Sequence, residues 1–556
     1  MYQKFKATLQ AIHNRSNFNI SPFLLGLVSS ILLILLYNNS LWRAILERQD
    51  SLNIENALFI TSLFITLVLL TKLIISIVSI RYLFKPMLII LFIASSLASY
   101  FMDSYGIMIE QTMLENVLAT DMSESLELFN SSLFFSFIIY GLLPSYLIYR
   151  CTINYKPVIR ETLTRIGIIS ITALLLFGNI FLLYPEYSSF TREHKVLRFL
   201  VNPINYLWAV GLSSVNQLSN AMPQQLTAIG SDATLTKSWQ QRGKKSLSIL
   251  VIGETARAEN FSLYNYARKT NPELAKKDII IFNNVFSCGT TTEVSLPCIF
   301  SHHERQGFKT SSAKYNENLL DIIKRSGISV LWRENNSGCK GICDRIDTSY
   351  TAHQKNIPFC NDRECFDEAL LHDIDNYIQQ QDGDIFLVFH QKGSHGPAYH
   401  LRYPEKFERF TPVCRSNQLQ DCTREQVVNA YDNTILYTDF FLSKVIDFLK
   451  DRSQEFDTSM IYVSDHGESL GEQNFYLHGL PYTFAPDTQK HVPMMMWFSE
   501  GFERSYGIQR SCIDNKRDGA YSHDNIFHSV LGMLGITTSA LNKELDIFSD
   551  CKTENP

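Results

Sequence analysis

The sequence lacks an excess of positive charge, and its first half has almost no cysteine. The 556 residues carry a formal net charge of −5, which argues against a nucleic-acid partner because such a partner needs a basic face. Of the 11 cysteines, only Cys151 precedes residue 288. The others lack the repeated two-residue spacers, with nearby histidines in register, of cysteine-based zinc sites. These absences argue against a nucleic-acid-binding protein and against a cysteine-ligated zinc module.

The mean hydropathy of −0.04 averages two unlike halves of the chain. Long apolar runs dominate up to about Tyr184, whereas the sequence beyond about Lys244 is rich in charges, turns and histidine. A chain of this length has room for more than one domain. We therefore expect a transmembrane domain over residues 1–184, a bridging interfacial segment and polar linker over 185–243, and a soluble domain over 244–556.

Five apolar segments are about long enough to cross a bilayer, which takes roughly 20 helical residues. Their approximate bounds are Phe18–Leu41, Ala57–Ile80, Pro86–Met102, Ser131–Tyr149 and Ile166–Tyr184. The fourth contains Pro144, which a membrane helix tolerates when its neighbours satisfy the freed backbone groups. Lys72 lies toward one end of the second segment, where its ammonium is expected to snorkel to the interface. The sequence therefore predicts five transmembrane helices.

The charges of the loops predict the orientation of these helices. The N-terminal stretch carries Lys4, Lys6 and Arg15 and no acidic residue, whereas residues 103–127 are acidic and contain no Lys or Arg. Because cytoplasmic loops are enriched in Lys and Arg, the N-terminus is expected in the cytoplasm. Five crossings then put the soluble domain on the outer side.

The acidic third loop shows a helical spacing of apolar residues between Tyr105 and Asp121. One interpretation is an amphipathic helix on the outer membrane surface. The other is a connecting helix that packs on the soluble domain. Both interpretations stay open at this point.

Ten cysteines lie in the soluble part, and an even number there indicates disulfides in an oxidising compartment. This agrees with the orientation that the loop charges predict. Spacing alone does not prove which cysteines pair. The expected pairs are four close couples, Cys288–Cys298, Cys339–Cys343, Cys360–Cys365 and Cys414–Cys422, with Cys512–Cys551 left as a long-range fifth.

From Ser246 the sequence alternates short β-rich runs with helix-like stretches, as in α/β folds. The runs are SLSILVIG, DIIIFNNVF, ISVLW, DIFLVFH and SMIYVSD. They are nearly continuously apolar, which indicates strands covered on both faces in a mostly parallel sheet. In such sheets, functional sites form at the C-terminal ends of the strands.

Residues of metal-binding type follow several of these runs. They are Glu254 after the first run, Thr290, Thr291 and Thr292 after the second, His390 and His395 at and beyond the fourth, and Asp465 and His466 at the end of the last. Glu254, Asp465 and His466 would leave one position of a tetrahedral zinc site for a threonine oxygen. Metal coordination would activate that hydroxyl, which is a poor nucleophile at neutral pH. His395, His478 and Lys340 are candidates to hold phosphate oxygens, the leaving group or a second metal.

Each of these residues has a simpler explanation when taken alone. A glutamate after a strand often caps a helix, an Asp-His pair is common by chance, and threonine clusters usually satisfy backbone groups in turns. Their shared position after successive strands favours a joint functional site.

Five motifs, GETAR, CGTTTEVSLPC, KGSHGPAY, SDHGESLGE and YLHGLP, occur in this order along the soluble part. They resemble signatures of the phosphoethanolamine transferases of Gram-negative envelopes, a family that includes the mobile colistin-resistance enzymes and belongs to the alkaline-phosphatase-like superfamily. The resemblance covers the whole chain. It implies an N-terminal α-helical membrane domain with five transmembrane helices and a periplasmic loop helix near 105–121. It also implies a C-terminal α/β alkaline-phosphatase/sulfatase-like domain with a mostly parallel sheet.

The resemblance also implies roles for individual residues. The zinc site would consist of Glu254, Thr292, Asp465 and His466. Thr292 is selected from the three threonines as the nucleophile that becomes modified with phosphoethanolamine. Further matching positions line the substrate phosphate or a second zinc ion, or bind substrate: His395, His478, Lys340 and Glu405. In the third loop, Thr112 and Asn116 resemble residues near the donor head group.

The reaction that the resemblance implies is a two-step transfer. Thr292 attacks phosphatidylethanolamine, diacylglycerol leaves, and the phosphoethanolamine group then passes to a lipid A phosphate, with one Zn²⁺ or two as cofactor. The added amine reduces the negative surface charge and weakens the binding of cationic peptides such as polymyxins, including colistin. The protein would be a multi-pass monomer of the bacterial inner membrane with a periplasmic catalytic domain.

Three other functions stay open beside this one. The first is a closely related transferase with the same metal site, whose acceptor would be core oligosaccharide or another periplasmic glycan. A hydrolase of phosphate or sulfate esters would share the chemistry of the superfamily. A non-catalytic envelope sensor is the third, and the intact set of Glu254, Thr292, Asp465 and His466 argues against it.

Overall fold

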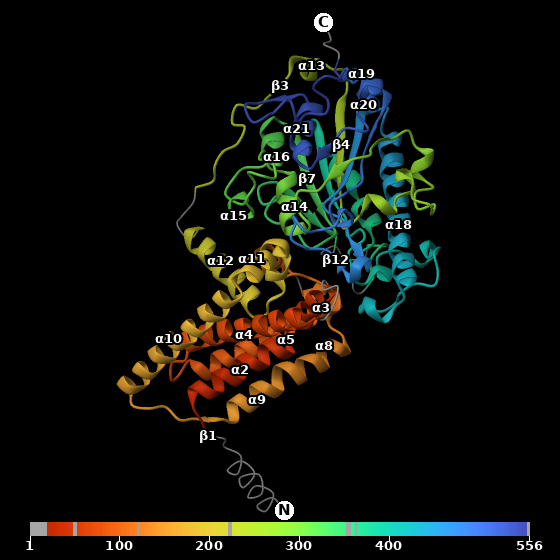
Figure 1. Ribbon diagram of the computed structural model, residues 1–556. Helices are drawn as coiled ribbons and strands as arrows, with labels where there is room; N and C mark the ends of the chain where they lie inside the picture. The colour runs from red at the N-terminus through yellow and green to blue at the C-terminus, as the bar shows by residue number, and fades with distance from the viewer. Residues whose placement is uncertain are drawn as a thin grey trace, which may run out of the picture. The chain divides into compact units, whose positions relative to one another are not determined.

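The chain forms two compact units in a computed structural model that describes residues 19–47, 53–120, 122–220, 225–351, 357–361 and 364–552. The first unit contains Met1–Leu114 and Phe129–Leu212, and the second contains Glu115–Leu128 and Ser213–Pro556. Figure 1 labels the helices and strands of both units. Lys4, Lys6 and Arg15, as well as residues 221–224 of the expected linker, lie outside the described residues.

The first unit consists mainly of apolar helices. Within the described residues, four are long and apolar enough to cross a membrane: α4 (Ile54–Ile77), α5 (Phe84–Tyr105), the continuous run Ser131–Arg150 and α10 (Val158–Leu182). The expected first span is instead a pair of helices, α2 (Pro22–Leu36) and α3 (Asn39–Leu46), bent by 56°. The total is five if this bent pair crosses as one span. Shorter elements complete the unit: α11 (Tyr184–Glu193), η2 (Lys195–Leu200), the first part of α12 (Ile204–Asn220), which belongs to the second unit from Ser213 onward, and the paired strands β1 (Asn19–Ile20) and β2 (Thr152–Ile153).

A buried pair of asparagines lies at the break between α2 and α3. The Asn38 amide donates to the carbonyl oxygens of Leu33, at 2.9 Å, and of Asn202, at 2.8 Å. The backbone N–H of Asn202 donates back to Asn38 Oδ1 at 2.8 Å. Asparagine offers backbone groups an alternative to helical hydrogen bonds, so this long-range pair stabilises a bend that apolar content alone does not predict.

Pro144 is accommodated by a local change of helix type. The run Ser131–Arg150 comprises α8 (Ser131–Ser136), the π-helical segment η1 (Phe137–Leu142) and α9 (Leu143–Arg150). A proline within a helix displaces the carbonyl four residues earlier, which here belongs to Tyr140. That carbonyl accepts a hydrogen bond from the Tyr37 hydroxyl. The residue that follows α2 therefore satisfies the freed backbone group, in agreement with the expectation that neighbouring segments accommodate Pro144.

The third loop forms two short helices, α6 (Gln111–Ala119) and α7 (Met122–Leu128), and its part from Glu115 onward belongs to the second unit. The Thr310 hydroxyl donates to Glu115 at 3.4 Å. Asn417 donates to the Glu127 carbonyl oxygen at 2.7 Å, and Arg402 forms an ion pair with the Glu127 carboxylate. The structure thus supports packing of this loop on the soluble domain.

The second unit contains a seven-stranded sheet that is mostly parallel, as predicted. Its order is β5 (Ile280–Phe282), β13 (Met494–Phe498), β10 (Phe456–Ser464), β4 (Lys245–Gly253), β9 (Ile385–His390), β7 (Ser329–Glu334) and β8 (Asp347–Tyr350). Only the pairings of β13 with β10 and with β5 are antiparallel. The run DIIIFNNVF is not one strand: β5 joins this sheet, whereas β6 (Val285–Phe286) pairs with β14 (Tyr521–Ser522).

Helices cover both faces of the sheet, which explains why its strands are apolar throughout (Figure 1). Leu250 and Ile252 of β4 pack in the core with α14 (Thr292–Ile299), α16 (Leu319–Arg325) and α21 (Asp524–Met533). The alternate residues Leu247, Ile249 and Val251 pack in a second core with α17 (Ile374–Ile378) and α18 (Arg424–Asp451). Alternation along β4 therefore supplies two separate cores.

The ten cysteines of the second unit form the five disulfides expected from their spacing: Cys288–Cys298, Cys339–Cys343, Cys360–Cys365, Cys414–Cys422 and Cys512–Cys551. Cys151 of the first unit is a free cysteine. Shorter elements of the second unit are α13 (Lys237–Gln240), α15 (Thr310–Ala313), α19 (Glu500–Ser505), α20 (Arg510–Asn515) and the strand pairs β11–β12 (Ser469–Leu470, Tyr476–Leu477) and β3–β15 (Thr234–Leu235, Ile536–Thr537).

Candidate metal and nucleophile site

The C-terminal ends of four parallel strands meet at one edge of the sheet. Gly253 of β4 is in register with Ser464 of β10, and His390 of β9 is in register with Ile252 and with Glu334. The residues that follow these ends are therefore close in space, although they are far apart in sequence.

Glu254, Asp465 and His466 form a fully buried cluster at this edge. One ligand atom from each lies within 4.8 Å of the other two, and each residue is 0% exposed. The Thr292 hydroxyl donates to the two Glu254 carboxylate oxygens at 3.3 and 3.1 Å and lies 3.4 Å from His466 Nε2. Thr292 is the first residue of α14. The structure thus brings together the four residues that the sequence singles out as a zinc site.

Neighbouring groups fix the orientation of the cluster. The backbone N–H groups of Thr255 and His466 donate to Asp465 Oδ1 at 3.1 and 2.7 Å. His466 Nδ1 lies 2.9 Å from the Gly467 carbonyl oxygen, which assigns the ring proton to Nδ1 and directs Nε2 at the cluster. Gly393 allows a close backbone approach, since a Cβ there would lie 2.7 Å from the Glu254 carbonyl oxygen.

The protonation of the cluster reflects its burial and its mutual charges. Burial and the negative charge of Glu254 raise the pKa of Asp465 to about 6. Burial would lower the pKa of His466, but the charge of Asp465 and the hydrogen bond with Glu254 raise it to about 10. Burial would raise the pKa of Glu254, yet the hydrogen bond and the charge of His466 hold it well below its usual range. The two carboxylates therefore depend on nearby positive charge.

The cluster fits a metal cation. Asp465 Oδ2 is buried and accepts no hydrogen bond within the described part of the chain. Two buried carboxylates beside each other need a compensating cation. A donor set of two carboxylates, one imidazole nitrogen and one hydroxyl oxygen suits Zn²⁺.

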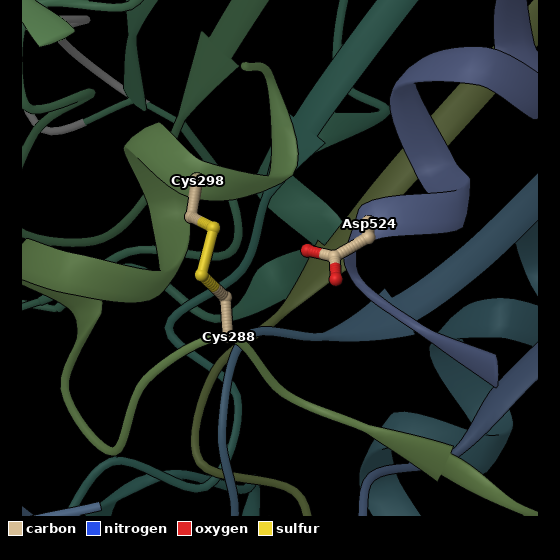
Figure 2. Close-up of side chains that lie close together, drawn as sticks. All are labelled: Cys288, Cys298 and Asp524. Carbon is tan, nitrogen blue, oxygen red and sulfur yellow. A yellow bond between two sulfur atoms is a disulfide. The ribbon is translucent and has the colours of Figure 1, made fainter. Parts of the chain in front are cut away.

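In the part of the chain that the structure describes, two other groups of potential ligands each contain a disulfide in place of free thiols. Figure 2 shows the first, in which the sulfurs of Cys288 and Cys298 are bonded to each other beside Asp524. Asp524 Oδ1 accepts a hydrogen bond from the Arg305 backbone N–H at 2.8 Å. The bond between Cys288 and Cys298 joins the start of the threonine loop to α14 and so constrains Thr292. The second group, Cys339, Cys343 and Asp344, likewise contains a disulfide.

His395 and His478 lie beside the cluster. The ring of His478 lies 4.3 Å from that of His466 and 6.0 Å from that of His395, between ring centroids. Burial and the charges of His466 and His395 lower the pKa of His478 to about 3, so its ring is neutral. A neutral imidazole can ligate a metal or accept a hydrogen bond.

The remaining predicted residues have different surroundings. Lys340 Nζ lies 3.8 Å from the carboxylate of Glu293, the residue after Thr292. Glu405 starts an exposed 3₁₀ turn. Thr112 donates to Glu110 at 2.7 Å within the first unit, and the Asn116 carbonyl oxygen accepts from Thr120 at 2.9 Å. The structure thus brings Lys340 close to the threonine loop, and the roles of Glu405, Thr112 and Asn116 stay predictions.

Sequence reasoning missed two neighbours of the cluster at the end of β7. Asn336 donates to Glu254 Oε2 at 2.6 Å and lies 3.4 Å from His390 Nε2. The buried Glu334 carboxylate lies 3.0 Å from His390 Nδ1. The signal was the same as for Glu254, because the polar letters REN directly follow the predicted strand ISVLW.

A third missed residue is Glu468, inside the motif SDHGESLGE. It is fully buried, and its carboxylate lies 3.5 Å from His478 Nδ1. Burial raises the pKa of Glu468 well above its usual range. Its position two residues after His466 is the signal that points to it.

A sulfatase-type α/β domain joined to a unit of membrane helices is the class of protein that this fold and site define. The sulfatase family model matches residues 246–536, and the model of the phosphoethanolamine transferases EptA/EptB matches residues 67–218. The chain is 37% identical over 553 residues to phosphoethanolamine transferase EptA of Escherichia coli strain K12, which covers 98% of this chain and 99% of the relative. This chain therefore belongs to the phosphoethanolamine transferase family.

Two further relatives have a similar extent. Phosphatidylethanolamine transferase Mcr-2 of Escherichia coli is 39% identical over 535 residues, covering 94% of this chain and 97% of the relative. The solved structure of the integral membrane protein lipooligosaccharide phosphoethanolamine transferase A (EptA) from Neisseria meningitidis matches with a TM-score of 0.92 and 34% identity, over 96% of this chain and 99% of that one. The likeness thus includes the membrane helices as well as the soluble domain.

Proposed function

We propose that this protein transfers phosphoethanolamine from phosphatidylethanolamine to a phosphate group of lipid A, with Thr292 as the covalent nucleophile. The observation that carries the proposal is the position of the Thr292 hydroxyl, 3.1 Å from Glu254 and 3.4 Å from His466. Thr292 also begins α14, and backbone N–H groups at a helix N-terminus favour a bound phosphate group.

The reaction takes place in two balanced steps. In the first, the Thr292 oxygen forms a bond to phosphorus while the bond from phosphorus to diacylglycerol breaks, and the hydroxyl proton leaves with diacylglycerol. In the second, a lipid A phosphate oxygen forms a bond to the same phosphorus and the bond to Thr292 breaks. Thr292 then takes back a proton, so the enzyme is regenerated.

Glu254, Thr292, Asp465 and His466 would hold Zn²⁺, and a bound Zn²⁺ would lower the pKa of the threonine hydroxyl and stabilise charge on a phosphoryl oxygen. His395 and His478 would hold the substrate phosphate or a second Zn²⁺. Lys340 and Glu405 would contact substrate, and Thr112 and Asn116 would lie near the donor head group. These roles rest on the motifs and, for the cluster, on the distances given above.

The family and the membrane helices support a multi-pass protein of the bacterial inner membrane. We infer from the loop charges that the N-terminus is cytoplasmic and that the catalytic domain is periplasmic. Disulfides in the second unit agree with an oxidising compartment. The expected consequence of lipid A modification is resistance to polymyxins such as colistin, and we expect the protein to act as a monomer.

Mass spectrometry of lipid A tests the proposal. Cells that express the wild-type protein should contain lipid A with an added phosphoethanolamine, and Thr292→Ala should reduce this product by at least about 10³-fold, as expected for loss of a nucleophile. Thr291→Ala is the matched control, because the Thr291 side chain makes no capping hydrogen bond to α14. The isolated wild-type protein, given donor and no acceptor, should carry phosphoethanolamine on Thr292.

Three outcomes would contradict the proposal. A modified glycan with unchanged lipid A would favour the other acceptor class. Release of free phosphoethanolamine at the same rate with and without acceptor would favour a hydrolase. Full activity of the Thr292→Ala protein would exclude the covalent route.

A further inference from the structure

A cavity of about 280 Å³ lies in the first unit, whereas the proposed metal ligands all belong to the second unit. It is formed where the end of α4 meets the start of α10 and the residues around the start of α2. The side chains that matter here are Phe23, Lys72, Lys156, Glu161 and Arg165. A ligand bound in this cavity would have a role separate from the transfer reaction, because the proposed metal and nucleophile cluster belongs to the other unit.

Lys72 is a buried charge directed into this cavity. Only 3% of its surface is exposed, so the snorkelling to open interface that the sequence suggests is wrong. Its ammonium donates to Ser76 Oγ at 3.0 Å and lies 5.0 Å from the centre of the Phe23 ring. Gly26 provides the space, since a Cβ there would lie 2.9 Å from Lys72 Nζ. The helices thus form a closely packed pocket around the Lys72 ammonium.

The cavity has more positive than negative groups. Lys156 Nζ donates to Thr164 at 3.2 Å, and Arg165 donates to the Ser79 carbonyl oxygen at 3.5 Å. Glu161, the acidic residue of the lining, accepts from the Lys156 backbone N–H at 2.9 Å. Among the described residues, no carboxylate oxygen lies within 4.0 Å of these two cationic groups or of Lys72. Lys72 is buried, Arg165 is half-buried and Lys156 is exposed. Because a buried charge without a counter-charge is costly, the Lys72 ammonium in particular favours an anionic ligand in the cavity.

The surroundings favour a lipid over a free anion. Ligand pockets for whole small molecules usually have roughly 300–1,000 Å³, so a cavity of about 280 Å³ has room for a head group and not for acyl chains. The outer face of α10 is apolar and exposed, with Leu163 at 65% and Ile166 at 55% exposed. Ile168 of the same helix lines the cavity. Acyl chains would therefore continue along α10 while the phosphate meets the cations.

We propose that this cavity binds the anionic head group of a phospholipid, with Lys72, Lys156 and Arg165 around its phosphate. The loop charges put this end of the helices in the cytoplasmic leaflet. Because cations outnumber carboxylates in the lining, the site selects a net anionic head group such as that of phosphatidylglycerol over the zwitterionic head group of phosphatidylethanolamine.

Native mass spectrometry of the full-length protein in detergent tests this site. The protein is titrated separately with phosphatidylglycerol, phosphatidylethanolamine and inorganic phosphate. The wild-type protein should retain phosphatidylglycerol at concentrations where the other two do not bind. Lys72→Met, which keeps most of the length of the side chain and removes its charge, should weaken phosphatidylglycerol binding about tenfold or more, as expected for a lost charge-assisted hydrogen bond.

A second variant and a control keep the test decisive. Arg165→Gln, at a half-buried position, should weaken binding by a similar factor even if Lys72→Met fails to fold. Lys85→Met is the matched control, because Lys85 is a half-buried cation near the same end of the helices whose ammonium donates to the Tyr149 carbonyl oxygen at 3.0 Å. Wild-type affinity in a folded Arg165→Gln or Lys72→Met protein overturns the proposal. Equal binding of phosphatidylethanolamine overturns the selectivity, and displacement of the lipid by equimolar phosphate overturns the lipid as ligand.

Discussion

The two units of this protein bury polar groups in different ways. In the second unit, charged groups are buried in compensated clusters, such as Glu254 with His466 or Arg402 with Glu127 and Glu364. In the described part of the first unit, the internal polar contacts are mainly neutral. The Tyr187 hydroxyl, for example, lies 3.0 Å from Ser62 Oγ and 2.8 Å from Thr66 Oγ1.

The difference follows from the solvent that each unit faces. The second unit buries its apolar residues on both faces of a sheet, and this burial stabilises it enough to hold costly charged groups in place. The membrane helices expose apolar side chains outward. In α10, for example, only 11% of the most apolar 18-residue stretch is buried. Helices in lipid gain little from apolar contacts with each other and depend on close packing and hydrogen bonds. A catalytic cluster of charges is therefore expected in the second unit.

The largest predicted effect concerns that cluster. Asp465→Asn should lower transfer activity by at least about 10³-fold, since it removes a charge from the proposed zinc ligands. It should also remove bound zinc, measured by metal analysis of the purified protein. Hydrogen exchange should increase at the ends of β4 and β10 and stay unchanged in α4 and α5. Asp447→Asn, in a partly exposed ion pair with Lys277, is the control. Normal zinc content in the Asp465→Asn protein would contradict the proposed ligand set.

The next effect concerns the buried ion cluster of Arg402, whose side chain is 0% exposed. Arg402 pairs with Glu127 and Glu364 and donates to the His395 carbonyl oxygen at 2.8 Å. Arg402→Met should destabilise the second unit by about 3–5 kcal/mol, because it leaves two carboxylates without their partner. Chemical denaturation followed by intrinsic fluorescence measures this.

Arg415→Gln is the matched control for that change. Arg415 is 63% exposed in its ion pair with Glu408, and exposed pairs contribute about 0–1 kcal/mol. Equal costs for the two substitutions would show that burial of the pair does not set its contribution.

The sequence predicts much of the structural difference between the two units. Apolar run length predicts the helices α4, α5 and α10, because a bilayer requires a minimum length. The bend between α2 and α3 was not predicted, since it depends on Asn38 and Asn202, which are distant in sequence. Likewise, Lys72 near a helix end suggests snorkelling, and only the packing of Gly26 and Phe23 shows that it is buried.

In the second unit, position after a strand predicts which residues come together. Glu254, Asp465 and His466 follow β4 and β10, and register between these parallel strands makes them neighbours. Asn336 follows β7 in the same way, but its contact with Glu254 is not among the sequence predictions. The antiparallel strand β13 was also missed, because its run MMMWF is short and rich in methionine, which has no strong preference for strands. Thr292 is distinguished from Thr290 and Thr291 only by resemblance and by its contacts.

Disulfides occur only in the second unit among the described residues, and removing them measures how much they stabilise that unit. Replacing both Cys512 and Cys551, which are 39 residues apart, by serine should cost about 4 kcal/mol in a chain-entropy model. Replacing Cys339 and Cys343, which are 4 residues apart, should cost about 2 kcal/mol. Denaturation of the second unit under non-reducing conditions measures both. The reverse order would show that strain or contacts outweigh loop entropy.

The smallest predicted effect is the loss of a single tyrosine hydroxyl, which can be tested in both units. Tyr431→Phe removes a hydroxyl that donates to the Thr255 carbonyl oxygen at 2.8 Å and accepts from the Arg257 N–H at 3.0 Å. Both groups are buried, so the cost should be about 1–3 kcal/mol. Tyr187→Phe should cost only about 0.6 kcal/mol, typical of a hydrogen bond between membrane helices.

The expected difference has a structural reason. Ser62 and Thr66 lie in α4, where each hydroxyl can turn to the carbonyl oxygen four residues earlier when Tyr187 is lost. The backbone groups of Thr255 and Arg257 have no such alternative in a buried loop beside Glu254, so Tyr431→Phe should also lower transfer activity. Thermal melting of both full-length variants in detergent, with transfer assays in parallel, measures the two costs. A Tyr187→Phe cost as large as that of Tyr431→Phe would show that the polar contacts of the membrane unit are as specific as those around the proposed metal and nucleophile cluster.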